Sequence, residues 1–74
     1  MNEEKRKRLI RGYIGEKLKG MLRAAKKGMW GVVHMDYDEI LGMVSYMLLV
    51  DDISEEQYTR ILKLASIIKR RCYK

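Results

Sequence analysis

Apolar residues recur at helical spacing near both ends of the chain, and an almost wholly apolar stretch lies between them. In the first segment, residues three or four apart fall on one helical face, and they are Ile10, Ile14, Leu18, Met21 and Ala25. Lys26 and Lys27 then occupy a last turn where cations complement the helix dipole. Gly28 suits the position just beyond a helix end. The pattern predicts a helix over residues 3–27.

The middle of the chain predicts a second helix over residues 36–50. Asp36 as N-cap and Glu39 three residues later form a capping-box pattern, and Met35 and Ile40 occupy the positions of a hydrophobic staple. The residues after Ile40 are apolar on nearly every side of such a helix. Two neighbouring helices would cover only part of this surface.

The third segment predicts a helix over residues 54–72. Ser54 is its expected N-cap and Gln57 its partner in a second capping box, with Ile53 and Tyr58 as the staple. Its apolar residues again form one stripe, which consists of Tyr58, Ile61, Leu62, Ala65, Ile68 and Cys72.

Two features of the sequence allow more than one interpretation. The connection 28–35 is apolar, so we expect Trp30 to fold back as a buried plug, whereas an exposed Trp30 would be a binding anchor. Gly12 and Gly15 lie on the polar side of the first helix, where glycine lowers helix stability. They indicate either a frayed or bent helix or a smooth patch that a partner's backbone approaches closely.

The 74 residues suffice for one domain, 1–74, and contain no proline to break a helix. Three helices with short connections predict an all-α fold, a small three-helix bundle in up-down-up order. Its expected core consists of Ile10, Ile14, Leu18, Met21, Ile40, Val44, Met47, Leu48, Tyr58, Ile61, Ala65 and Ile68.

Charge is segregated along the chain more strongly than the net charge of +6 suggests. Residues 28–59 contain no Lys or Arg, whereas the segments on both sides are rich in them. In an up-down-up bundle, the ends of the first and third helices meet at one pole. That pole is the predicted nucleic-acid-binding site, and it consists of Arg23, Lys26, Lys27, Lys69, Arg70 and Arg71.

Binding at this pole would depend on backbone phosphates and would not be sequence-specific. A helix-turn-helix protein reads bases with the first residues of its recognition helix. Here those residues include Glu55 and Glu56, which phosphates would repel.

Surplus apolar surface supports an alternative, a protein-binding inhibitor or adaptor with no nucleic-acid contact. Its predicted interface consists of Trp30, Tyr46, Leu49 and Val50. The same surplus on the second helix favours a helix-mediated homodimer, since two-fold dimers are the commonest oligomers.

No constellation in the sequence predicts catalysis, a metal site, a cofactor or a small-molecule substrate. The segment from His34 to Glu39 holds several metal-ligating residue types, but helix capping accounts for its acids. Cys72 is the single cysteine, so no internal disulfide or cysteine zinc site is expected. We predict that the chain is not an enzyme.

The longest uncharged stretch, residues 40–50, has 11 residues, against the roughly 20 that a membrane helix needs. With no secretory signal pattern at the start, a cytoplasmic location is expected. The leading hypothesis is a small regulatory or accessory protein, of the kind that phages and mobile elements encode. It would engage nucleic acid, or a nucleic-acid-bound machine, through its basic surface.

Overall fold

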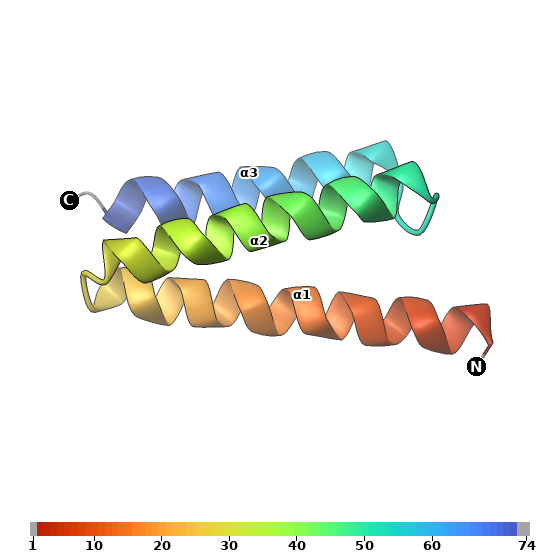
Figure 1. Cartoon of the computed structure of the whole chain (residues 1–74), viewed down its shortest axis with the longest axis horizontal. Coiled ribbons are helices and arrows are strands. Elements are labelled where there is room, and N and C mark those ends of the chain that lie inside the picture. The colour runs from red at the N-terminus through yellow and green to blue at the C-terminus, as the bar shows by residue number, and fades with distance from the viewer. Residues whose placement is uncertain (1, 73–74) are drawn as a thin grey trace.

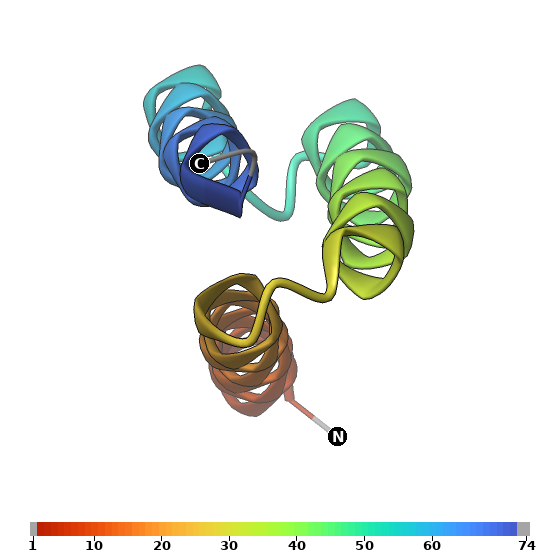
Figure 2. The same ribbon diagram turned by 90° about the vertical axis from the view of Figure 1, so that its left-hand side faces the viewer.

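The computed structural model describes residues 2–72, which form three α-helices: α1 (Glu3–Lys26), α2 (Trp30–Leu49) and α3 (Glu55–Cys72). Successive helices run in opposite directions, so α1 and α3 are parallel and end at the same pole (Figure 1). Viewed along the helices, α2 packs against both others, while α1 and α3 contact each other least (Figure 2). This arrangement confirms the predicted three-helix bundle.

The end of α1 is formed by Gly28, as the sequence predicts. Gly28 has a positive φ of 72°, which glycine adopts without steric cost. Its N–H donates to the carbonyl of Ala25 at 3.1 Å, and the N–H of Met29 donates to the carbonyl of Ala24 at 2.9 Å. These two bonds make a Schellman motif and turn the chain directly into α2.

The predicted start of α2 at Asp36 is wrong, because the helix already begins at Trp30. Residues 30–35 of the expected loop are helical, and the N–H of Val33 donates to the carbonyl of Met29 at 3.1 Å. Val33 is completely buried, so helical geometry here places an apolar side chain in the core. That burial outweighs the local capping signal at Asp36.

The buried plug expected of Trp30 is also wrong, because 62% of this residue is exposed. The pair Asp36 and Glu39 has a different use from capping. Three residues apart on one face of α2, both carboxylates contact the ammonium group of Lys17 on α1. The spacing that suggested a capping box thus serves an ion-pair link between two helices.

The capping box of α3 is confirmed. The N–H of Gln57 donates to the hydroxyl of Ser54 at 3.1 Å, and the N–H of Ser54 donates to the side-chain carbonyl of Gln57 at 2.9 Å. Beside it, Ile53 is buried, which matches its expected role in the staple. The start of α3 is therefore fixed locally as well as by packing.

The core lies between the three helices and contains the expected residues. Those that are buried are Ile14, Met21, Ile40, Val44, Met47, Ala65 and Ile68. The other five expected core residues, Ile10, Leu18, Leu48, Tyr58 and Ile61, are partly buried and pack against them. Ala24, Val33 and Ile53 are buried in addition, beyond the expected set. Within residues 2–72, no helix is long and apolar enough to cross a membrane.

Candidate functional site

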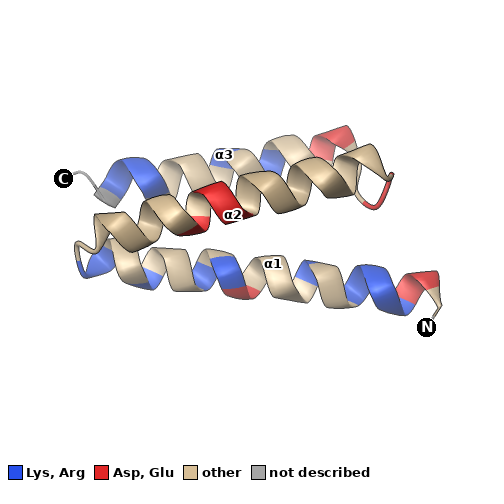
Figure 3. Ribbon diagram, viewed as in Figure 1, with Lys and Arg blue, Asp and Glu red and all other residues tan. Residues whose placement is uncertain are grey.

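The six cations of the predicted nucleic-acid site lie at the pole where α1 and α3 end (Figure 3). We call this set the basic pole, and it consists of Arg23, Lys26 and Lys27 from α1 and Lys69, Arg70 and Arg71 from α3. All of them except Lys69 are exposed. The cations lie at one pole because α1 and α3 are parallel and each has basic residues in its last turn.

Lys69 differs from the other five. It is half-buried, and its ammonium group lies 4.4 Å from the centre of the Tyr37 ring. This cation–π contact holds the ammonium group of Lys69 over the ring of Tyr37 on α2. The hydroxyl of Tyr37 lies 3.5 Å from the Ser66 hydroxyl, which further links α2 to α3. Lys69 therefore has a packing role, and five exposed cations remain for an external ligand.

Lys17 of α1 partly offsets the negative charge of two acids of α2, Asp36 and Glu39. Its ammonium group contacts Glu39 directly and lies 3.6 Å from Asp36. The hydrogen bond to Glu39 raises the pKa of Lys17 above its usual value, despite partial burial of the amine. The single positive charge of Lys17 therefore offsets only part of the negative charge of Asp36, Asp38 and Glu39.

Trp30 lies at the same end of the molecule as the basic pole, as the first residue of α2. Its ring makes an edge-to-face contact with His34 one turn later, with ring centres 6.0 Å apart and planes at 88°. Trp30 follows Lys26 and Lys27 after two residues of connection. An exposed aromatic ring therefore accompanies the exposed cations.

The structure does not bring together the four residues of the predicted protein interface. Tyr46, Leu49 and Val50 lie at the far end of α2, and Leu49 is 80% exposed. Leu49 lies nineteen positions after Trp30 in the same helix, which corresponds to roughly 28 Å along the axis. The predicted set is therefore two sites, with Trp30 beside the basic pole and the other three residues at the opposite end.

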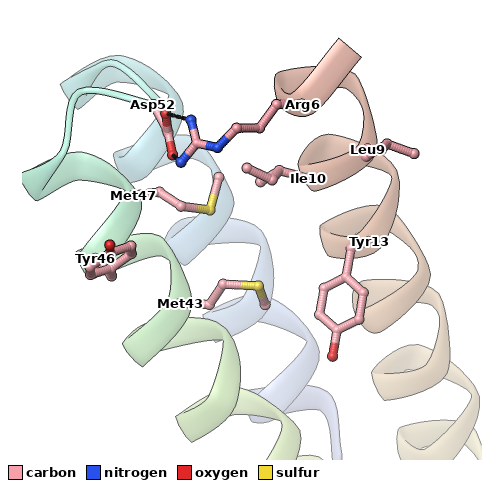
Figure 4. Close-up of a pocket in the computed structure, with 8 residues that line it drawn as sticks. All are labelled: Arg6, Leu9, Ile10, Tyr13, Met43, Tyr46, Met47 and Asp52. Carbon is pink, nitrogen blue, oxygen red and sulfur yellow. Dashed lines mark hydrogen bonds and ion pairs between the residues drawn. The ribbon is translucent and has the colours of Figure 1, made fainter. Parts of the chain in front are cut away.

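At that opposite end, an apolar groove of about 310 Å³ separates α1 from α2 (Figure 4). Its apolar lining consists of Leu9, Ile10, Tyr13, Met43, Tyr46 and Met47. An ion pair between Arg6 and Asp52 closes one end of it, with guanidinium–carboxylate distances of 2.5 and 2.6 Å. Sequence reasoning missed Leu9 and Tyr13, although their i,i+4 spacing places both on one face of α1.

Comparisons with protein-family models, with curated proteins and with solved structures found no match. Across the part of the chain that the structure describes, no three His, Cys, Asp or Glu side chains gather as they would around a metal ion.

Proposed function

We propose that this chain is a small non-catalytic accessory protein that binds the nucleic-acid backbone through its basic pole, alone or within a nucleic-acid-bound assembly. The observation that carries the proposal is an exposed Trp30 beside five exposed cations. Cations attract phosphates, and an accessible aromatic ring stacks on unpaired bases. A surface with both features favours single-stranded nucleic acid.

The acids at the start of α3 support a mode of binding without sequence specificity. Glu55 and Glu56 are exposed in the first turn of α3, at the pole opposite the basic one. Insertion of this helix end into a groove would bring two carboxylates against phosphates. Contacts from the basic pole would instead position the chain on the backbone, with similar affinity for different sequences.

The salt dependence of binding tests the proposal. Five phosphate contacts predict a slope of log K against log salt of roughly −4.5 on duplex DNA and roughly −3.5 on a single strand. We expect the variant Arg70→Glu/Arg71→Glu to bind every sequence more weakly and to make the slope less negative by about 2. Fluorescence anisotropy with labelled duplex DNA, single-stranded DNA and RNA measures both quantities.

The matched control is Lys5→Glu/Arg8→Glu, which makes the same change of charge at the start of α1, where both residues are exposed. It should retain most of the affinity, because it leaves the basic pole unchanged. Absence of binding to all three nucleic acids at low salt would contradict the proposal. An equal loss in the control would show that only the overall charge matters.

A second candidate function is protein binding through the apolar end of the molecule. Its specific support is the exposure of Tyr46, Leu49 and Val50 at the end of α2, where Tyr46 also lines the groove between α1 and α2. Exposed apolar surface of this kind is typical of an interface. A second copy of the chain is the simplest partner, and self-association at this end is compatible with nucleic-acid binding at the other.

A further inference from the structure

A second apolar groove runs along the opposite side of the molecule, between α1 and α3. Two adjoining hollows of about 270 and 550 Å³ form it, and both are lined by Gly15 and Leu18. The lining comes from α1, α3 and Ile53 just before α3, and no residue of α2 contributes to it. The groove lies between the two helices that contact each other least, since α1 and α3 each pack mainly against α2 (Figure 2).

The floor of this groove is apolar and incompletely covered. Its apolar side chains are Ile14, Leu18, Leu22, Ile53, Ile61, Leu64, Ile67 and Ile68. Leu64 is 47% exposed and Ile67 is half-buried, so the floor still presents apolar surface to water. Covering that surface would be favourable, at a free energy roughly proportional to the area covered.

The rim of the groove is basic throughout. Arg11 and Lys19 line it from α1, Arg60 and Arg71 line it from α3, and no carboxylate lines either hollow. Lys19 lies 3.7 Å from Glu16, and Arg60 lies 2.8 Å from Glu56. Both are exposed pairs within one helix, which contribute little to stability and exchange readily for another carboxylate.

We propose that this groove docks an acidic amphipathic helix of another protein, with its apolar stripe on the floor and its carboxylates against the four basic rim residues. Lining residues span 11 to 22 on α1 and 57 to 71 on α3, or roughly 16 to 21 Å of helix axis. That length takes three to four helical turns. A helix antiparallel to α1 and α3 would complete a four-helix bundle.

Charge argues against a second copy of this chain as the occupant. Its α1 and α3 are themselves basic along the groove. Its α2 would bring Asp38, whereas Asp36 and Glu39 are already paired with Lys17. Because α2 and the groove lie on different sides of the molecule, such a contact would also be head-to-tail and would not close into a dimer.

Gly15 leaves space on the floor of the groove. It lies in the interior of α1, where glycine is less favourable than alanine. A Cβ atom built there meets nothing within 4 Å, so packing within the described chain does not require a glycine. Since Gly15 lines both hollows, its missing side chain leaves room for close approach by a docked helix.

The test uses designed helical peptides of about 14 residues, the length of the groove. All carry the same stripe of Leu and Ala, flanked by Glu in one peptide, Lys in a second and Gln in a third. We expect the Glu-flanked peptide to bind at least about tenfold more tightly than the Lys-flanked one, because the rim is basic. Fluorescence anisotropy gives the affinities, and amide chemical shifts locate the contact.

Charge reversal at two of the four rim residues should remove this preference, because two cations and two carboxylates then line the groove. In Arg11→Glu/Arg60→Glu, the Glu-flanked peptide should lose about tenfold in affinity and approach the affinity of the Lys-flanked peptide. The control Arg8→Glu/Lys63→Glu makes the same charge change at exposed residues of the same helices that do not line the groove. Arg71 belongs to both the basic pole and the rim. Neither double variant changes it or any other residue of the basic pole, so this proposal and the nucleic-acid proposal can fail separately.

A steric variant separates docking from stability. Gly15→Leu should raise the melting temperature, since leucine favours helix. It should also lower the affinity for the Glu-flanked peptide by about tenfold or more. Gly12→Leu is its control, because Gly12 is exposed and lines neither hollow. It should raise the melting temperature and leave peptide affinity unchanged.

Several results would overturn the proposal. They are no binding of the Glu-flanked peptide at millimolar concentration and low salt, equal affinity for all three peptides, and equal effects of the rim and control variants. A change of oligomeric mass in Arg11→Glu/Arg60→Glu would assign the groove to a second copy. Loss of nucleic-acid affinity in that variant, with peptide affinity unchanged, would assign it to nucleic acid.

Discussion

Arg6 and Asp52, 46 residues apart, form a bidentate ion pair that joins the start of α1 to the turn between α2 and α3. Asp52 is the one buried charged residue among those described, and only 5% of its side chain is exposed. Arg6 is about half exposed and reaches over it. The hydrogen bonds and charge of Asp52 raise the pKa of Arg6, so the arginine is always charged.

We predict that Arg6→Met is more destabilising than the double variant Arg6→Met/Asp52→Asn. The single change leaves a carboxylate buried without its cation, whereas the double change removes the charge as well. Chemical denaturation of both variants gives the free energies of unfolding. Lys7→Met is the control, because its exposed pair with Glu3 should contribute little. Equal stability of the two Arg6 variants would mean that water solvates Asp52.

The core offers a comparison between two isoleucines that the sequence did not distinguish. Ile40 is completely buried, and we expect Ile40→Ala to cost about 2–5 kcal/mol. Ile61 is half-buried on the floor of the groove between α1 and α3, so Ile61→Ala should cost distinctly less. Urea denaturation measures both free energies of unfolding. A larger loss of stability in Ile61→Ala than in Ile40→Ala would contradict the deeper burial of Ile40.

Local signals predicted helix ends well where no long-range contact competed with them. The capping box of Ser54 and Gln57 and the turn glycine Gly28 are both present. The similar pattern at Asp36 failed, because burial of Val33 extends α2 by almost two turns towards its start. Val33 lies seven residues before Ile40, a helical repeat that could have revealed the longer helix.

The functional surfaces were predictable to the extent that they follow from helix order. Parallel α1 and α3 place the six cations at one pole, as charge segregation indicated. The contact of Lys69 with Tyr37 and the groove between α1 and α3 depend on how far apart the helices pack. A single sequence carries no direct signal for that spacing.

The ion pair of Lys17 predicts a pH dependence in alkali. The pKa of Lys17 is raised in the folded protein. Its ion pair therefore contributes fully to stability below the usual lysine pKa of about 10.4, and this contribution is lost as the pH rises through the higher pKa of the folded protein. The difference in unfolding free energy between the unaltered chain and Lys17→Met should therefore be constant between about pH 6 and 9 and shrink above about pH 10.4. A difference that already shrinks near neutral pH would mean that another group titrates there.

The exposed end of α2 predicts self-association. Leu49→Glu should leave the stability within about 0.5 kcal/mol of the unaltered chain, because Leu49 is 80% exposed. It should also shift a dimer to monomer in sedimentation experiments, since a charge at an apolar interface is costly. Thr59→Glu, an exposed change on α3, serves as control. If the unaltered chain is monomeric at all concentrations, this end does not bind a second copy.

Trp30 distinguishes stacking on bases from simple attraction of phosphates. It is the only tryptophan in the chain, so its fluorescence reports its own surroundings. If it stacks on a base, single-stranded nucleic acid should quench the fluorescence. Trp30→Ala should then weaken binding about 5- to 150-fold, the range for loss of one stacked base. Folding should survive, because 62% of the residue is exposed.

Two controls make the interpretation of the Trp30 variant specific. Trp30→Phe keeps an aromatic ring and should retain most of the affinity, because every base has a face on which a ring stacks. Tyr46→Ala removes an equally exposed aromatic residue at the opposite end of α2 and should leave the nucleic-acid affinity unchanged. Duplex DNA should lose much less affinity than a single strand in Trp30→Ala, because its bases are already stacked. Equal losses on both would indicate that Trp30 supports the basic pole structurally and does not contact bases.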